Sequence, residues 1–130
     1  DDSSIYIVML KSINAKEFVK NEDLDKALIE LSNAREILNS KNQNFSFLKE
    51  IINLRMANIF IVLDDLESAK NILEVPFSTN LVNKLILQGD ILTKENNFIE
   101  AKQKYNQALE KTANESQKKL INLKISTLMK

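Results

Sequence analysis

The chain has 130 residues, of which 44% are hydrophobic and 28% charged, and its formal net charge is zero. This length suits one domain with a real core, and this composition is ordinary for a folded protein. The lack of Cys and His excludes thiol nucleophiles, disulfides and zinc sites built from those residues. One Gly and one Pro are too few for the turns of a sheet protein, so we predict an all-α fold.

Charge is spread unevenly along the chain. Residues 1–81 hold 9 Lys or Arg and 13 Asp or Glu, whereas residues 82–130 hold 9 and 5. Nucleic-acid binders usually show a strongly basic domain with Arg or aromatic contacts. Here there are two Arg and no basic run longer than Lys118-Lys119. We therefore expect a solvated helix surface and no nucleic-acid partner, with an anion-binding surface on the last third as the alternative.

Three stretches of the chain repeat one pattern. Each begins with a small residue, has a large apolar residue three positions later and an alanine twelve positions later. Small residues let antiparallel helices approach closely, and such hairpins must stack to bury their apolar faces. The pattern predicts a solenoid of three helical hairpins. The repeated positions are Ala15, Ala57 and Gly89; Phe18, Phe60 and Leu92; Ala27, Ala69 and Ala101; and Leu31, Leu73 and Tyr105.

The turn inside each hairpin is polar. Asp23, Asp65 and Asn97 stand in register there and are expected to cap the second helix of each pair. Asn97 and Glu100 also have the spacing of a capping box. Capping explains the acidic pairs in these turns better than catalysis, which needs a cleft and opposed pKa shifts. We therefore expect no enzyme activity, no cofactor and no metal site.

We expect a single domain spanning residues 1–130, with repeats over about 8–41, 45–78 and 82–115 and a capping helix over about 116–130. The central helix, 45–63, is apolar nearly all round, so it should be buried on several sides. Pro76 should end the second helix of the middle repeat early. The apolar face of the last helix consists of Leu120, Ile121, Leu123, Ile125 and Leu128, of which we expect Leu120, Leu123 and Leu128 to cover the third repeat.

The third stretch resembles the tetratricopeptide repeat. Gly89, Ala101, Tyr105 and Ala108 match its small, Ala, aromatic and Ala positions. The resemblance implies a short right-handed α-solenoid of about three hairpins, in which the first helix of each pair lines a concave groove.

That alignment places an apolar set on the groove face of the central helix, flanked by polar residues. Apolar side chains left in water would each forgo about 1.5–3 kcal/mol. The groove is therefore filled by the N-terminal helix, by a segment preceding Asp1, or by a partner peptide or helix, unless the repeats are misaligned. The predicted partner-binding residues are Ile51, Leu54, Asn58, Ile61 and Val62, with Lys16, Lys20, Asp90 and Lys94 around them.

Three segments resemble a narrower family, the periplasmic domain of YfgM, the ancillary subunit of the bacterial SecYEG translocon. They are IINLRMANIFI (51–61), LILQGDILTKENNFIEAKQKY (85–105) and LINLKISTLMK (120–130). The resemblance implies a non-catalytic interaction domain on the periplasmic face of the inner membrane, held by a membrane anchor that precedes this chain. It also implies the translocon and the periplasmic chaperone PpiD as partners, in assisting proteins that leave SecYEG.

The alternative is a cytosolic, and hence cytoplasmic, tetratricopeptide adaptor that binds chaperone tails or other peptides. That binding mode usually needs a clamp of Lys and Asn residues for the peptide carboxylate. Lys16 and Asn58 fit it, whereas Ser12, Asn83 and Leu87 stand at other expected clamp positions. The chain therefore matches the clamp only in part.

Overall fold

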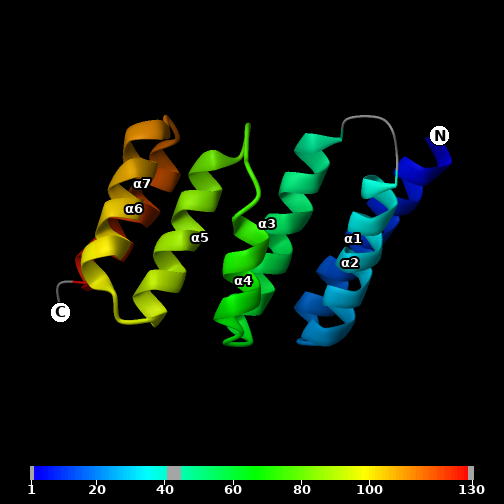
Figure 1. Ribbon diagram of the computed structural model, residues 1–130, viewed down its shortest axis with the longest axis horizontal. Helices are drawn as coiled ribbons and strands as arrows, with labels where there is room; N and C mark the ends of the chain where they lie inside the picture. The colour runs from blue at the N-terminus through cyan, green and yellow to red at the C-terminus, as the bar shows by residue number, and fades with distance from the viewer. Residues whose placement is uncertain (1, 41–44, 129–130) are drawn as a thin grey trace.

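The structure is a computed structural model that describes residues 2–40 and 45–128, and within these ranges it contains helices and no strand (Figure 1). The predicted all-α fold is therefore confirmed. The expected repeat limit at residue 41 and the last two residues of the expected capping helix lie outside the described residues. The helices are α1 (Asp2–Lys20), α2 (Leu24–Asn39), α3 (Ser46–Val62), α4 (Leu66–Leu73), α5 (Leu81–Lys94), α6 (Phe98–Lys111) and α7 (Glu115–Leu128).

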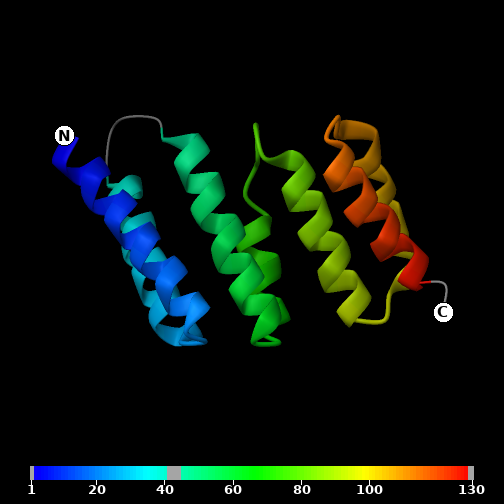
Figure 2. The same cartoon turned by 180° about the vertical axis from the view of Figure 1, so that it is seen from behind.

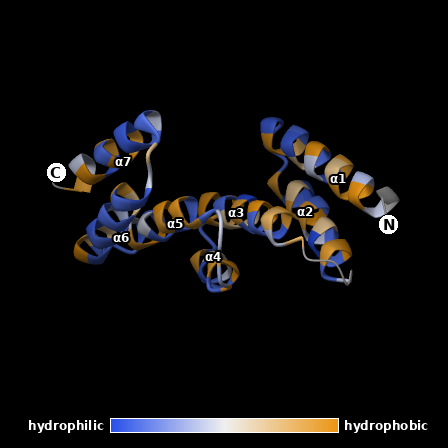
Figure 3. Cartoon of the chain, turned by 90° about the horizontal axis from the view of Figure 1, so that it is seen from above, coloured by the Kyte–Doolittle hydropathy of each residue, from blue (hydrophilic) through white to orange (hydrophobic). Residues whose placement is uncertain are grey.

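The helices form a curved stack of hairpins. Helix α1 packs on α2, α3 on α4, and α5 on α6, while α7 closes the stack against α6. Seen from above, α1 and α7 rise on one side of the row made by α2, α3, α5 and α6, and α4 lies on the other side (Figure 3). The stack therefore has a concave face formed by α1, α3, α5 and α7, which faces the viewer in Figure 2.

The turns inside the three hairpins share one backbone geometry. Glu22, Asp64 and Asn96 have φ of 62°, 62° and 64°, the left-handed region. In each turn the next N–H bonds back five residues, as in Asp65 N to Phe60 O at 2.8 Å. This is the Schellman ending of an α-helix, which usually takes Gly at the left-handed position. Here Glu, Asp and Asn adopt it, so the hairpins turn tightly without Gly.

A side-chain capping hydrogen bond forms at one of these three turns. Asp65 accepts a hydrogen bond from the Ser68 backbone N–H at 3.2 Å. Asp23 and Asn97 stand at the N-cap positions, as predicted, but their side chains make no capping hydrogen bond. The Asp23 carboxylate instead lies 3.5 Å from the Lys26 ammonium.

The repeated alanines lie inside the stack. Ala27, Ala69 and Ala101 are fully buried. One core cluster lies among α1 to α4 and includes Ile91 of α5, and a second lies among α5, α6 and α7. The central helix α3 is buried on several sides, as its apolar character predicts, because it packs on α2, α4 and α5.

Ala101→Leu is expected to lower the free energy of unfolding by about 1–3 kcal/mol, because the larger side chain has no room in the second cluster. Thermal and urea unfolding measure the change. Lys102→Leu is the matched control, since residue 102 is exposed on the same helix. Equal stability of the two variants would contradict the packing described here.

Helix α4 is short, as Pro76 predicts. It has 8 residues, whereas α2 has 16 and α6 has 14. It therefore covers only the C-terminal half of α3, and the chain reaches α5 through a loop beside the N-terminal half.

Glu50 of α3 anchors that loop. Its side chain is buried, and its two oxygens accept hydrogen bonds from the backbone and side chains of Ser78, Thr79 and Asn80 at 2.8–3.1 Å. Burial raises the pKa of this carboxyl, but the hydrogen bonds outweigh it and lower the pKa from 4.5 to about 2. The charged carboxylate thus fixes the start of α5 against α3.

Candidate protein-interaction groove

The concave face carries a groove made of three adjoining hollows. The central hollow, about 450 Å³, lies among α3, α5 and α7. A second, about 230 Å³, lies among α1, α2 and α3, and a third, about 290 Å³, among α3, α5, α6 and α7. The central hollow shares Arg55 and Asn58 with the second, and Asp90 and Lys124 with the third. The three hollows are therefore continuous along the concave face.

Most of the predicted partner-binding residues line this groove. Ile51, Leu54, Asn58 and Asp90 line the central hollow. Lys16 lines the second hollow, and Ile61 and Lys94 line the third. Val62 and Lys20 line none of the three hollows.

The predicted apolar groove residues of α3 differ in how exposed they are. Ile61 is only 6% exposed and belongs to the first core cluster, so little of it can touch a partner. Val62 is 62% exposed at the end of α3. Ile51 and Leu54 are partly exposed. The groove floor therefore comes from the first half of α3 more than from its last turn.

Helix α7, which the sequence predicts as a capping helix, also forms one wall of the groove. Gln117, Leu120 and Lys124 line the central hollow. Leu120 is 48% exposed and Leu123 62%, so the expectation that they cover the third repeat is wrong. Ile121, fully buried, does this instead, with Ile125 and Leu128 packed against the same cluster. The helix is rotated so that Leu120 faces the hollow.

A partly buried polar network lies in the third hollow. Tyr105 donates its hydroxyl proton to Asp90 at 2.5 Å, and the Lys124 ammonium donates to the same oxygen at 2.9 Å. Burial and the Asp90 bond raise the pKa of the Tyr105 phenol well above its usual range. A Cβ on Gly89 would lie 2.7 Å from Cδ1 of the Tyr105 ring, which explains why Gly stands there. The network joins α5, α6 and α7.

Two further hydrogen bonds span the groove walls. Arg55 of α3 donates to the Ser12 hydroxyl of α1 at 2.7 Å, and Gln117 of α7 donates to Asn83 of α5 at 2.9 Å. The sequence pattern did not single out Arg55 as a groove residue. The sequence could have indicated Arg55 as a groove residue, because it lies four residues after Ile51 and therefore on the same helix face.

The arrangement is suited to binding a peptide or helix. Partly exposed apolar side chains form the floor, while amides and ammonium groups form the rim, as in a protein interface with an apolar centre. None of the helices described is both long and apolar enough to cross a membrane.

Comparisons with known proteins agree with this architecture. The chain is 30% identical over 128 residues to a protein named ancillary SecYEG translocon subunit from Buchnera aphidicola subsp. Acyrthosiphon pisum, and 30% identical over 135 residues to its namesake from Buchnera aphidicola subsp. Schizaphis graminum. Each alignment covers 98% of this chain and 64% of the relative, so the chain spans less than two thirds of their length. The resemblance expected from the sequence is thus confirmed.

No solved structure matches the chain significantly. The family model for the tetratricopeptide repeat-like domain matches residues 1–130, the whole chain. With its helical hairpins and concave groove, the chain belongs to the tetratricopeptide repeat-like domain family.

Proposed function

We propose that this chain is a non-catalytic interaction domain that holds partner proteins beside the SecYEG translocon, on the periplasmic face of the inner membrane. Two findings support the proposal. Relatives aligned over 98% of the chain are named ancillary SecYEG translocon subunit. The concave face offers a continuous groove with an apolar floor, which suits an extended peptide or an amphipathic helix.

The central hollow is the observation that carries the proposal. It combines the partly exposed Leu54 and the exposed Leu120 with amide groups of Asn58 and Asn83. Because apolar groups at the centre exclude water and polar groups at the rim set direction, this hollow can bind a partner side chain. The partner we propose is the soluble periplasmic region of the chaperone PpiD.

The alternative role, a cytoplasmic adaptor with a carboxylate clamp, gains no support from the geometry. Ser12 already accepts a hydrogen bond from Arg55, and Asn83 accepts one from Gln117. Of the clamp positions, Lys16 and Asn58 match, whereas Ser12, Asn83 and Leu87 stand at the others. We therefore do not propose it.

Replacing Leu54 and Leu120 together by Ser is expected to weaken binding of the soluble PpiD region at least about tenfold, or roughly 1.4 kcal/mol. The pair removes apolar contact from the floor and from one wall of the central hollow. It avoids Ile61, which is a buried member of the first core cluster, whereas Leu54 is only partly buried against that cluster. Isothermal titration measures the affinity, and circular dichroism reports the helix content.

Ile99→Ser is the control, because Ile99 is 78% exposed on α6 and lines none of the three hollows. It should leave the affinity unchanged. If the double variant keeps its fold and its affinity, the groove is not the PpiD site. If the wild-type domain fails to bind PpiD at all, the proposed partner is wrong.

A further inference from the structure

A further hollow lies between α2, α3 and α4, outside the concave groove. We call it the α4 cleft; it measures about 610 Å³. It opens because the short α4 leaves the N-terminal half of α3 without a helix beside it. Its lining includes Arg35 of α2, Lys49 and Asn53 of α3, and Ile72 of α4.

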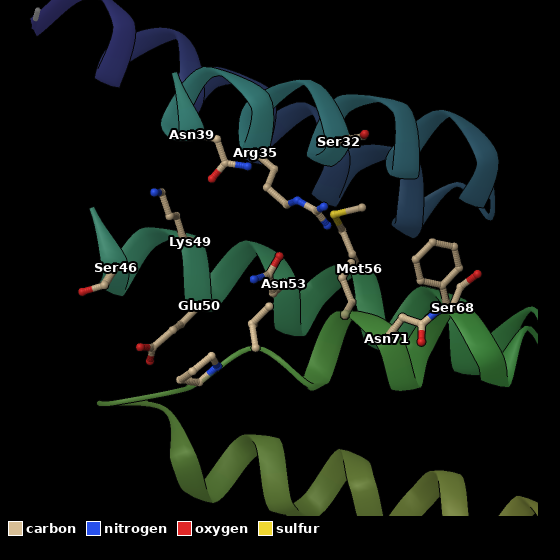
Figure 4. Close-up of a pocket in the computed structure, with 14 residues that line it drawn as sticks. Ser32, Arg35, Asn39, Ser46, Lys49, Glu50, Asn53, Met56, Ser68 and Asn71 are labelled. Atoms are coloured by element: carbon tan, nitrogen blue, oxygen red, sulfur yellow. The ribbon is translucent and has the colours of Figure 1, made fainter. Parts of the chain in front are cut away.

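The charges in the α4 cleft are unbalanced. Arg35 and Lys49 reach into the space between α2 and α3 (Figure 4). Among the described residues, neither side chain makes a hydrogen bond or an ion pair. Glu50 is the one acidic residue in the lining, and hydrogen bonds from Ser78, Thr79 and Asn80 already engage both of its oxygens. Two cations and one carboxylate thus line the cleft, and neither cation has an ion-pair partner among the described residues.

Asn53 gives a second, independent observation. Its side chain is 92% buried in the cleft wall, and its Oδ1 has no hydrogen-bond partner. Such an oxygen is costly to leave unpaired, because it has lost its water without gaining a donor. The oxygen lies inside the wall, and rotation of the amide about its last side-chain torsion would bring it to the cleft surface, where it would accept an N–H.

We propose that the α4 cleft binds an acidic peptide segment of a partner protein. A Glu or Asp side chain pairs with Arg35 and Lys49, and a neighbouring backbone N–H donates to Asn53 Oδ1. A nearby apolar side chain packs on the apolar lining. Peptide fits better than a lone anion, because the cleft offers an acceptor and apolar surface beside its cations. The apolar lining residues are Met56, Phe60, Ile72, Val75 and Pro76.

The test is an NMR titration of the full chain with acetyl-Ala-Glu-Ala-Leu-Ala-amide. We expect saturable shifts at the Asn53 side-chain amide and at backbone amides around Arg35 and Lys49. The same peptide with Gln in place of Glu should bind at least tenfold more weakly. Arg35→Glu with Lys49→Glu should weaken the Glu peptide at least tenfold as well.

Lys102→Glu with Lys111→Glu is the matched control, since it changes net charge equally at exposed positions of α6 outside the α4 cleft. It should change the affinity less than twofold. If the acidic double variant unfolds, Arg35→Gln with Lys49→Gln replaces it, and the same tenfold loss is expected. Because the α4 cleft and the concave groove share no lining residue, the shifted residues separate this proposal from the proposed function.

Four results would overturn the proposal. The first is equal affinity for the Glu and Gln peptides, or no saturable shift with either. The second is shifts confined to α5 and α7. The third is binding of the Gln peptide only when its C-terminus is a free carboxylate, which would mean that the cleft binds the C-terminal carboxylate of a partner and not an acidic side chain. The fourth is acetate alone giving the same shifts at the same affinity, which would reduce the cleft to a simple anion site.

Discussion

Glu50→Gln is expected to lower the free energy of unfolding at pH 7 by about 3 kcal/mol. The wild-type pKa falls from 4.5 to about 2, and a change of that size corresponds to about 3 kcal/mol. Gln has one amide NH2 group, a donor, in place of one carboxylate oxygen. If the NH2 group takes the place of Oε2, both hydrogen bonds from Ser78 are lost. If it takes the place of Oε1, the bonds from Thr79 and Asn80 are lost. Urea unfolding at pH 7 measures the loss.

The same carboxylate predicts a pH dependence with a definite sign. Its folded pKa lies below its unfolded pKa, so its contribution is fully present above about pH 4.5 and is lost as pH falls toward 2. The stability difference between wild type and Glu50→Gln should therefore shrink between pH 5 and pH 2. Glu110→Gln, at an exposed position of α6, is the control and should change stability by less than about 0.5 kcal/mol.

A difference below about 1 kcal/mol, or one that does not vary with pH, would contradict the anchoring role of Glu50. A change in α5 amide exchange tests the structural consequence. Protection at the start of α5 should fall in Glu50→Gln, because the loop at Ser78–Asn80 is no longer fastened to α3.

Deleting residues 117–130 is expected to cost about 3–6 kcal/mol and to promote aggregation. Ile121 is fully buried against the second core cluster, and burial of one such side chain contributes about 1.5–3 kcal/mol. Ile125 and Leu128 add partial burial, and the hydrogen bonds to Asn83 and Asp90 are lost. A terminal repeat stripped of its cap exposes apolar surface, which favours association. Thermal unfolding and light scattering measure both effects.

Two point variants of α7 test whether this helix caps the core or is only a tail without core contacts. Ile121→Ala should cost about 2–5 kcal/mol, whereas Leu123→Ala should cost less than about 0.5 kcal/mol because Leu123 is 62% exposed. If the truncated domain stays monomeric and melts as the wild type does, α7 contributes nothing to the core. Equal effects of the two point variants would mean that α7 packs in another rotation.

The repeat and its consequences are readable in the sequence. Ala27, Ala69 and Ala101 recur in register, and all three lie buried where two helices meet. Small residues are required at close helix crossings, so their spacing predicts the hairpins. The near absence of Gly and Pro excluded a sheet, and Pro76 predicted the short α4, because Pro cannot continue a helix.

Which face of each helix stays exposed is decided by the tertiary structure. Periodicity shows which residues share a face of a helix, but it does not show which neighbour covers that face. Thus Ile61 and Val62 look alike in the sequence, yet one is 6% exposed and the other 62%. The same ambiguity misassigned Leu120 and Leu123 of α7, whose rotation depends on where α5 and α6 stand.

Polar contacts between residues far apart in the chain also could not be predicted from the sequence. Glu50 reads as an ordinary surface carboxylate, and its partners lie 28 to 30 residues further on, in a loop without a recognisable motif. Only the folding of that loop back onto α3 brings the two together. The sequence by itself determined the all-α hairpin architecture, because local packing and turn rules act within each repeat. The tertiary structure alone decided the groove walls, the Glu50 anchor and the α4 cleft, because each depends on the relative placement of separate hairpins.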